Sequence, residues 1–433
     1  MPNQLAKLIK FLTLPWTYVN YCLVGTLIFL SAYTLSEKAV MSDNWTGPYL
    51  SAAANLEWGG EFLIDLDEVK TFKNLEQDQQ FNYKWATSTS LVHYNHNPIG
   101  YAYLIRIAKT VFPVGDMRSI IWLQILVHIV MCLSILVSLG TPIKKYLFTF
   151  LYCLNPIVLY VVGINFYYFW QAVPSSVLLL VYLNHWQSNR DRTQKPWLIA
   201  GTFCFLGIAV GLAFVSRPTI IGYLIVGGIM LFPAKTRLVC LFPMLVAFMF
   251  IVLSTWQPTE KNFWHTAYIG LGAYPNKHVK FLSDNEGYEL FEKTTGKILG
   301  VSVGGSYYET DTIRKYKAVT KERYFAIAKQ TPLLIFKNAS LNLLQGFAGG
   351  YFNKAPYFIH ISMAFLGLLV LLLLLWFREF FVLISCLLGL APFALYYPPI
   401  PAYMFGNYLL LAFGATSIAT KILLDFRRPK TSK

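Results

Sequence analysis

The sequence contains little charge. Only 13% of its 433 residues are Asp, Glu, Lys or Arg, about half of what a soluble domain carries, whereas 56% are hydrophobic. Apolar runs of about twenty residues recur along most of the chain, and an α-helix needs a run of this length to cross a bilayer. The composition excludes a water-soluble enzyme and predicts an all-α polytopic membrane protein.

Several chemical signatures are also missing. The six cysteines all fall inside apolar runs, which excludes an external disulfide framework and a paired-cysteine metal motif. There is no Gly-rich phosphate loop, no Ser-His-Asp order, no zinc-protease helix and no internal repeat. The net charge of +15 comes from short basic clusters between apolar runs, so we expect no nucleic-acid partner. We expect no cofactor and no metal site, and leave a need for a divalent metal open.

About ten transmembrane helices fit the apolar pattern. The first is interpreted as an uncleaved span and not as a secretory signal, because it is long for a signal and no convincing cleavage site follows. The expected spans lie near 17–35, 117–139, 146–163, 168–184, 197–214, 218–233, 238–255, 356–376, 380–397 and 404–423. We treat residues 1–433 as a single integral membrane domain.

The basic residues predict which side of the membrane each loop occupies. With the N-terminus in the cytoplasm, the short inner segments carry many Lys and Arg against the acids Asp191, Glu379 and Asp425. Both termini are then cytoplasmic, and two large loops, 36–116 and 256–354, are extracytoplasmic. Segments 97–112 and 331–347 are expected to be amphipathic helices at the outer surface within these loops. The polar mass of the protein therefore lies on the non-cytoplasmic face.

Asp43 follows the first span within a few residues. A carboxylate at the mouth of a helix bundle can accept a proton from an acceptor hydroxyl while that hydroxyl attacks a sugar carbon. The alternative is a helix cap or a solvated loop acid. Further along the same loop, Asp65 and Asp67 could hold a divalent metal, but a solvated acidic face is the favoured interpretation.

Cations in and near the loops could bind phosphate. His93 and His96 suit phosphate contact, proton handling or metal binding, although two histidines make a weak metal signal; a structured entrance to the following helix is the alternative. Arg217 lies between two apolar runs at the outer boundary, where its planar fork suits a lipid-linked phosphate. Interfacial snorkelling is the other interpretation of Arg217. Lys354 is a candidate of lower rank.

Four stretches resemble the GT-C superfamily of integral membrane glycosyltransferases, in particular the bacterial branch related to protein mannosyltransferases and the lipid A aminoarabinose transferase. They are SDNWTGPYLSAAANL (42–56), HNPIGYAYLIRIAKTVFP (96–113), KPWLIAGTFCFLGIAVGLAFVSRPTII (195–221) and YYPPIPAYMFGNYLLLAFGA (396–415). The third, which ends in a basic-Pro pair, is the most specific.

The resemblance implies a GT-C-like fold and a polyprenyl-phosphate sugar donor bound in the bilayer, with its sugar at the outer face. It implies that Asp43 is the catalytic base and Arg217 a donor-phosphate contact. It also implies that Asn44, Tyr49 and Tyr403 bind substrate.

The chain departs from the family pattern in two places. His96 and Asn97 stand where a lysine often precedes the proline of the second stretch, and Ala402 stands where an arginine often precedes the tyrosine of the fourth. His93, His96 and Lys354 are therefore candidates for binding the donor phosphate.

The expected function is transfer of the sugar to an acceptor hydroxyl by inverting displacement, in the inner (plasma) membrane of a bacterium. The acceptor is left open between a glycan, a lipid and an exported protein such as pilin. Two alternatives are a transporter or flippase of a lipid-linked sugar, and a ligase or polymerase of lipid-linked oligosaccharide. A transporter needs a polar route across the midplane, and the expected spans are almost free of charge.

Overall fold

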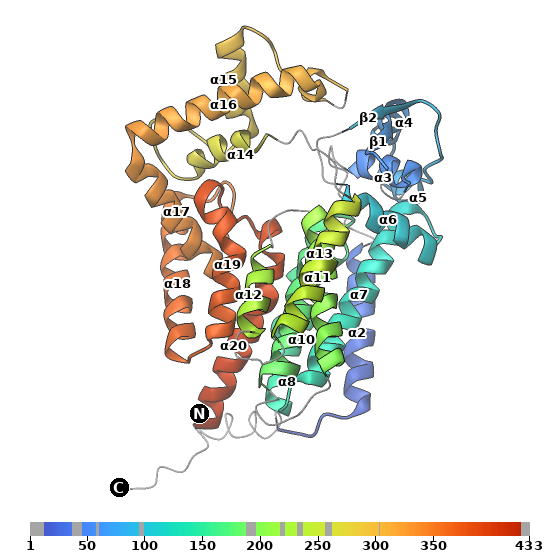
Figure 1. Cartoon of the computed structure of the whole chain (residues 1–433), viewed down its shortest axis with the longest axis vertical. Helices are drawn as coiled ribbons and strands as arrows, with labels where there is room; N and C mark the ends of the chain where they lie inside the picture. The colour runs from blue at the N-terminus through green and yellow to red at the C-terminus, as the bar shows by residue number, and fades with distance from the viewer. Residues whose placement is uncertain are drawn as a thin grey trace.

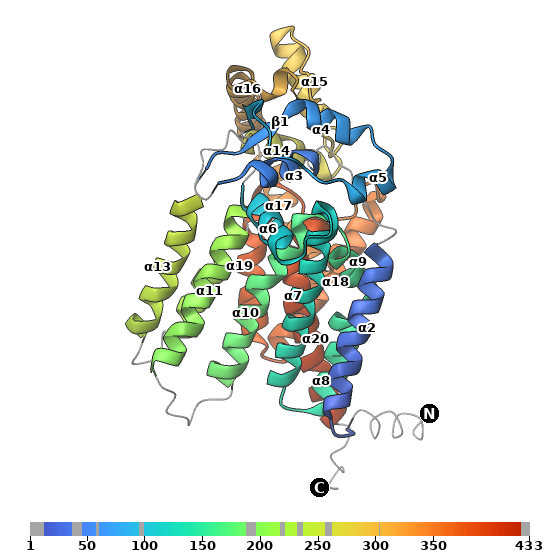
Figure 2. The same cartoon turned by 90° about the vertical axis from the view of Figure 1, so that its right-hand side faces the viewer.

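The computed structural model describes residues 13–36, 46–57, 60–94, 99–187, 196–216, 221–231, 237–255, 262–302 and 304–425. They form an upright helix bundle with a second layer at one end, which we call the loop layer (Figures 1 and 2).

The bundle contains all ten segments in which spans were expected. Its elements are α2 (Tyr18–Ser36), α7 (Asp116–Ser138), α8 (Pro142–Phe148), η1 (Thr149–Cys153), α9 (Pro156–Val162), η2 (Tyr167–Gln171), α10 (Ala172–Val181), η3 (Tyr182–Gln187), α11 (Pro196–Ser216), α12 (Gly222–Leu231), α13 (Arg237–Thr255), α18 (Tyr357–Trp376), α19 (Phe380–Tyr396), η6 (Pro401–Tyr403) and α20 (Phe405–Asp425). The all-α, polytopic fold class is confirmed.

The loop layer is built from the two large loops. The first loop forms α3 (Thr46–Asn55), β1 (Leu63–Asp65), α4 (Leu66–Lys73), α5 (Gln77–Asn82), β2 (Leu91–His93) and α6 (Gly100–Val111). The second forms α14 (Phe263–Gly270), η4 (Leu271–Ala273), α15 (Asp284–Thr295), η5 (Ser306–Tyr308), α16 (Thr310–Gln330) and α17 (Pro332–Phe347). The strands β1 and β2 pair antiparallel, with Leu63 opposite His93 and Asp65 opposite Leu91. Both loops fold over the same end of the bundle (Figures 1 and 2).

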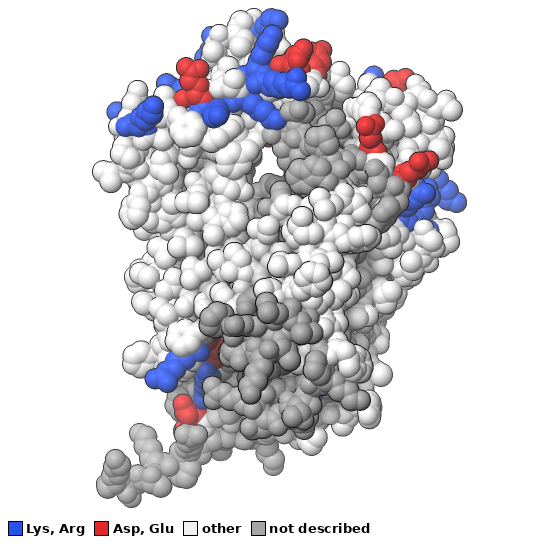
Figure 3. Space-filling model, in the orientation of Figure 1, with Lys and Arg blue, Asp and Glu red and all other residues white. Residues whose placement is uncertain are grey.

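Charged side chains gather at the two ends of the molecule. On the face seen in Figure 3, Lys, Arg, Asp and Glu colour the loop layer and the opposite end, and the described residues between them are white. Within the described ranges, five helices are long and apolar enough to cross a membrane: α2, α7, the part of α11 from Ile199, α18 and α20. A sixth span results if α8 with η1 and α9 count as one broken span with a bend of 56°. The protein is therefore an integral membrane protein with a polar layer on one side.

Close packing inside the bundle depends on glycine. In α11, a Cβ atom on Gly207 would lie 2.0 Å from the carbonyl oxygen of Met244 in α13. One turn further along α11, a Cβ atom on Gly211 would lie against Ile251 of α13. Small residues at such positions let two membrane helices approach closely, which explains how α11 and α13 pair.

Helix α17 connects the loop layer to the bundle. Leu333 and Phe336 in its first half are 79% and 71% exposed, as suits a helix at a membrane surface. Its second half packs between α18 and α19: a Cβ on Gly367 would touch Leu344, and a Cβ on Gly346 would touch Leu390. The expected surface helix is thus anchored in the bundle by its C-terminal half.

Candidate active site

Four of the predicted site residues, Asp43, Asn44, His96 and Arg217, lie outside the described residues. Their chain neighbours Thr46, Gly100 and Ser216 are described, and these begin α3, begin α6 and end α11.

Helix α6 packs against both α3 and α11 at the junction between the bundle and the loop layer. Rings of α3 and α6 meet where Tyr49 and Tyr101 lie 5.2 Å apart in an edge-to-face contact. Gly100 lies so close to α11 that a Cβ on it would be 2.6 Å from the backbone nitrogen of Ser216. The elements that flank three separate predicted residues therefore converge on one region.

Tyr49 is buried at the centre of this region. Its side chain is 1% exposed, and its ring lies 5.6 Å from that of Phe62 and 6.1 Å from that of Tyr167. Aromatic pairs at this spacing add about 0.5–1.5 kcal/mol each beyond the area they bury. Tyr49 therefore holds α3 against the bundle.

A row of rings joins Tyr49 to the other tyrosine predicted to bind substrate. Tyr167 lies 4.9 Å from Tyr168, and Tyr168 lies 5.9 Å from Tyr403. Tyr403, from η6, stacks on Phe393 of α19 at 5.4 Å and 13°. We call Tyr49, Tyr167, Tyr168 and Tyr403 the aromatic floor. It runs from the first loop, through η2, to the start of the last helix.

The segment that carries the centre of this floor also holds buried polar atoms that sequence reasoning missed. Asn165 and Gln171 are 3% and 2% exposed, and neither the Oδ1 of Asn165 nor either side-chain amide atom of Gln171 has a hydrogen-bond partner. The buried indole nitrogen of Trp170 also lacks a hydrogen-bond partner. Buried polar atoms without partners are rare and often mark a ligand or water site. The signal in the sequence is the pair of amides flanking the aromatic cluster 167–170.

The remaining predicted cations lie in exposed positions. His93 places Nδ1 3.2 Å from the Glu61 carboxylate, with both side chains more than half exposed. Lys354, between α17 and α18, is exposed and has a left-handed backbone with φ of 65°. A non-glycine residue rarely adopts that conformation.

The acidic pair of the first loop has a structural role. Asp65 caps α4 by accepting hydrogen bonds from the backbone of Asp67 and Glu68, and it accepts a third from the Ser88 hydroxyl. These bonds lower the pKa of Asp65. Asp67 is exposed and lies 3.4 Å from Lys70. Among the described residues, no group of three or more His, Cys, Asp or Glu side chains is placed to hold a metal ion.

His128 and His265 have partners that explain them. His128 is fully buried between Tyr152 and Phe169, as expected for a core residue. His265 of α14 contacts Tyr316 at 2.5 Å and the Asp284 carboxylate at 3.1 Å. The bond from His265 lowers the pKa of Asp284. These contacts join α14, α15 and α16, so His265 stabilises the second loop.

The two loops also contact each other. Tyr94, next to β2, stacks on Tyr308 of η5 at 5.3 Å and 27°. Burial, with the neighbouring phenol as a second cause, raises the pKa of Tyr94 well above its usual value, so its hydroxyl stays protonated at neutral pH.

Comparisons with known proteins are sparse. No protein-family model matches the chain, and no curated protein matches it. Among solved structures, the chain is similar to ArnT from Cupriavidus metallidurans in the apo state, with a TM-score of 0.32 at 11% identity. The similarity covers 91% of this chain and 77% of that one. The TM-score and the sequence identity are both too low to indicate the function of this chain.

Proposed function

We propose that the chain transfers a sugar from a polyprenyl-phosphate donor to an acceptor hydroxyl at the membrane face that the loop layer covers. The observation that carries the proposal is the convergence of α3, α6 and α11 beside the aromatic floor. These helices adjoin the segments with Asp43, His96 and Arg217, so a base and phosphate-binding cations would share one region.

The environment of this region suits a lipid-linked sugar. Aromatic rings stack on the apolar faces of sugar rings, and Tyr168 and Tyr403 are the half-buried rings of the floor that could offer such a face. The Oδ1 atom of Asn165 and the amide of Gln171 lack partners and could form hydrogen bonds with sugar hydroxyl groups. The apolar band between the two charged ends would hold the lipid chain. A soluble sugar nucleotide would need no such band.

The mechanism assigns one step to each type of group. Asp43 accepts the proton of the acceptor hydroxyl as its oxygen attacks the anomeric carbon, and the bond from that carbon to the lipid phosphate breaks. Negative charge grows on the departing phosphate, where Arg217 stabilises it, assisted by His93, His96 or Lys354. One direct displacement inverts the anomeric centre. The acceptor is a glycan, a lipid or an exported protein such as pilin.

Asp43→Asn tests the base. In liposomes with a synthetic polyprenyl-phosphate sugar and candidate acceptors, the variant should lower the transfer rate by ~10²–10⁴-fold, read as a mass shift on the acceptor. The matched control is Asp67→Asn, which removes an exposed carboxylate of the same loop and should leave the rate unchanged. Full activity of a correctly inserted Asp43→Asn protein would show that the base is another group.

The same assay separates the transferase from a flippase. With acceptor omitted, a flippase would still move labelled donor between the leaflets of the liposome, whereas a transferase would leave it in place. Donor movement without any acceptor product would replace our proposal. Arg217→Gln should weaken donor binding, and Arg106→Gln, which removes an exposed charge on α6, is the control.

A further inference from the structure

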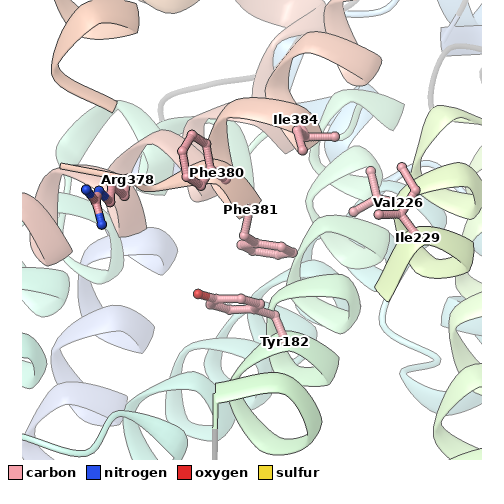
Figure 4. Close-up of a pocket in the computed structure, with 7 residues that line it drawn as sticks. All are labelled: Tyr182, Val226, Ile229, Arg378, Phe380, Phe381 and Ile384. Carbon is pink, nitrogen blue, oxygen red and sulfur yellow. The ribbon is translucent and has the colours of Figure 1, made fainter. Parts of the chain in front are cut away.

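A pocket opens at the end of the bundle opposite the loop layer. It lies where η3, α12 and the start of α19 meet, and its cavity volume is about 220 Å³ (Figure 4). Sites that enclose a whole drug-sized molecule measure ~300–1,000 Å³, so this pocket suits a segment of a chain.

The walls of the pocket are apolar. The Tyr182 ring stacks on Phe381 at 3.9 Å and 5°, and Val226 and Ile384 line the space beside them (Figure 4). Tyr182 begins the π-helical segment η3, and π-helical turns within helices are frequent at functional sites. Ile229 is 48% exposed, so the pocket opens toward the lipid-facing surface.

Arg378 provides the cation of the pocket. Its backbone has a left-handed φ of 57° at the end of α18. The backbone N–H of Arg378 donates to the carbonyl of Leu375, and the N–H of Glu379 donates to the carbonyl of Leu374. Glycine is the usual residue at this position of a helix end because it adopts the conformation without strain. A non-glycine residue in this strained conformation is a candidate for a functional role, which here would be carried by the guanidinium of Arg378.

The nearby carboxylate does not cancel this charge. Glu379 is 6% exposed, and its Oε1 atom lies 2.7 Å from Lys421 Nζ and 2.5 Å from the Ser417 hydroxyl. Lys144 lies within electrostatic range of both Glu379 and Lys421. Glu379 is therefore neutralised within its own pair, and the guanidinium of Arg378 is available to an anion.

We propose that this pocket binds an anionic glycerophospholipid of the leaflet opposite the loop layer. One acyl chain occupies the space beside Tyr182 and Phe381, and the phosphate binds the guanidinium of Arg378. Arg378 and Phe381 line the pocket at the turn from α18 to α19, and this turn lies at the end of the bundle opposite the loop layer (Figure 1). The donor lipid, with its phosphate at the loop layer, is therefore not the occupant.

Two substitutions of Arg378 test the proposal. Purified protein is titrated with phosphatidylglycerol and with phosphatidylcholine of the same acyl chains, and bound lipid is counted by native mass spectrometry. Arg378→Gln should weaken phosphatidylglycerol binding about tenfold and leave phosphatidylcholine unchanged. Arg378→Gly should lose the same preference while the lipid-free protein keeps or gains thermal stability, because glycine relieves the left-handed backbone. Loss of lipid preference can thus be separated from loss of fold.

Further variants complete the design. Ile384→Trp fills the pocket and should reduce retention of both lipids. Arg314→Gln removes an exposed arginine of the loop layer and should retain the wild-type preference. Equal binding of the two lipids by the wild type, or an unchanged preference in both Arg378 variants, overturns the proposal. So does displacement of phosphatidylglycerol by an equal amount of polyprenyl phosphate, since the pocket would then belong to the donor lipid.

Discussion

Gln171 and Gln124 are buried amides of the bundle that differ in their hydrogen bonds. Both side-chain polar atoms of Gln171 lack a partner, whereas in Gln124 only Oε1 lacks one. Nε2 of Gln124 donates to the carbonyls of Val162 and Ile164 at 2.9 and 2.6 Å. An unpartnered buried amide costs stability, and a protein keeps such a cost most readily at a functional site. At the residue scale, the amide of Gln171, without any partner, indicates a ligand site, whereas the amide of Gln124 holds two backbone carbonyls together.

Gln171→Leu should therefore stabilise the protein and impair its function. We expect the free energy of unfolding to rise by about 1–3 kcal/mol, because an unsatisfied polar group is replaced by an apolar one of similar size. The rate of sugar transfer should fall. Thermal unfolding in detergent, together with the transfer assay, measures both.

Gln124→Leu is the comparison for this experiment. It leaves two carbonyls without a donor and should destabilise by about 1–3 kcal/mol. Destabilisation by Gln171→Leu of the same size would indicate that a buried water satisfies its amide, and would remove this residue from the site.

At the scale of elements, two of the three glycines of helix α11 lie in contrasting surroundings. A Cβ on Gly207 would collide with the backbone of α13, whereas a Cβ on Gly201 would have nothing within 4 Å. The close pairing of α11 and α13 thus depends on the glycines that face α13, Gly207 above all, and not on the glycine content of the helix.

Gly207→Ala should destabilise the protein by about 1–3 kcal/mol or more, because the collision involves backbone that cannot rotate away. Gly201→Ala should be neutral or stabilise by up to about 1 kcal/mol, since alanine favours a helix. The melting temperature in detergent reports both changes. Equal effects of the two substitutions would contradict the close pairing of α11 and α13.

The helices themselves could be predicted from the sequence, and their irregularities could not. Runs of apolar residues determine where a helix is stable in lipid, so each of the ten expected spans overlaps a helical segment. Among the described residues, five of these segments, or six with the broken pair, are long and apolar enough to cross a membrane. Apolar composition does not encode where a helix bends, so the π-helical turns η1 and η3 and the shortness of α12 were not predicted. The insertion of α17 between α18 and α19 depends on contacts with Gly346 and Gly367 that are distant in sequence.

The candidate site was predictable to a similar degree. Tyr49 and Tyr403 were named from the family resemblance and stay predictions as substrate contacts, and the rings that link them come from η2, a segment that carried no prediction of a site. The capping role of Asp65 could be recognised only from the fold, because it depends on Ser88 across the first loop. Asp43 and Arg217 remain predictions.

At the scale of the whole molecule, both large loops cover one end of the bundle and the bundle presents an apolar band to lipid (Figures 1 and 3). Catalysis at the proposed site is therefore restricted to one side of the membrane. The basic residues of the sequence predict that this side is the extracytoplasmic one.

Cysteine labelling of intact cells tests that orientation. Asp67→Cys and Asp311→Cys, at exposed positions in the first and second loops, should react with a membrane-impermeant maleimide. Asp425→Cys, at the exposed end of α20, should react only after the cells are permeabilised. The unsubstituted protein controls for its native cysteines. Labelling in the reverse order would place the loop layer in the cytoplasm.

The contact of Tyr94 with Tyr308 affects how reactants would reach the proposed site. This ring pair joins the two large loops of the loop layer. A reactant that enters from water must pass beside the Tyr94–Tyr308 contact or separate the two rings. A reactant in the bilayer can enter laterally between helices. The two reactants would then reach the site by different routes. The space between the two loops beside the Tyr94–Tyr308 contact would limit the size of the reactant that enters from water.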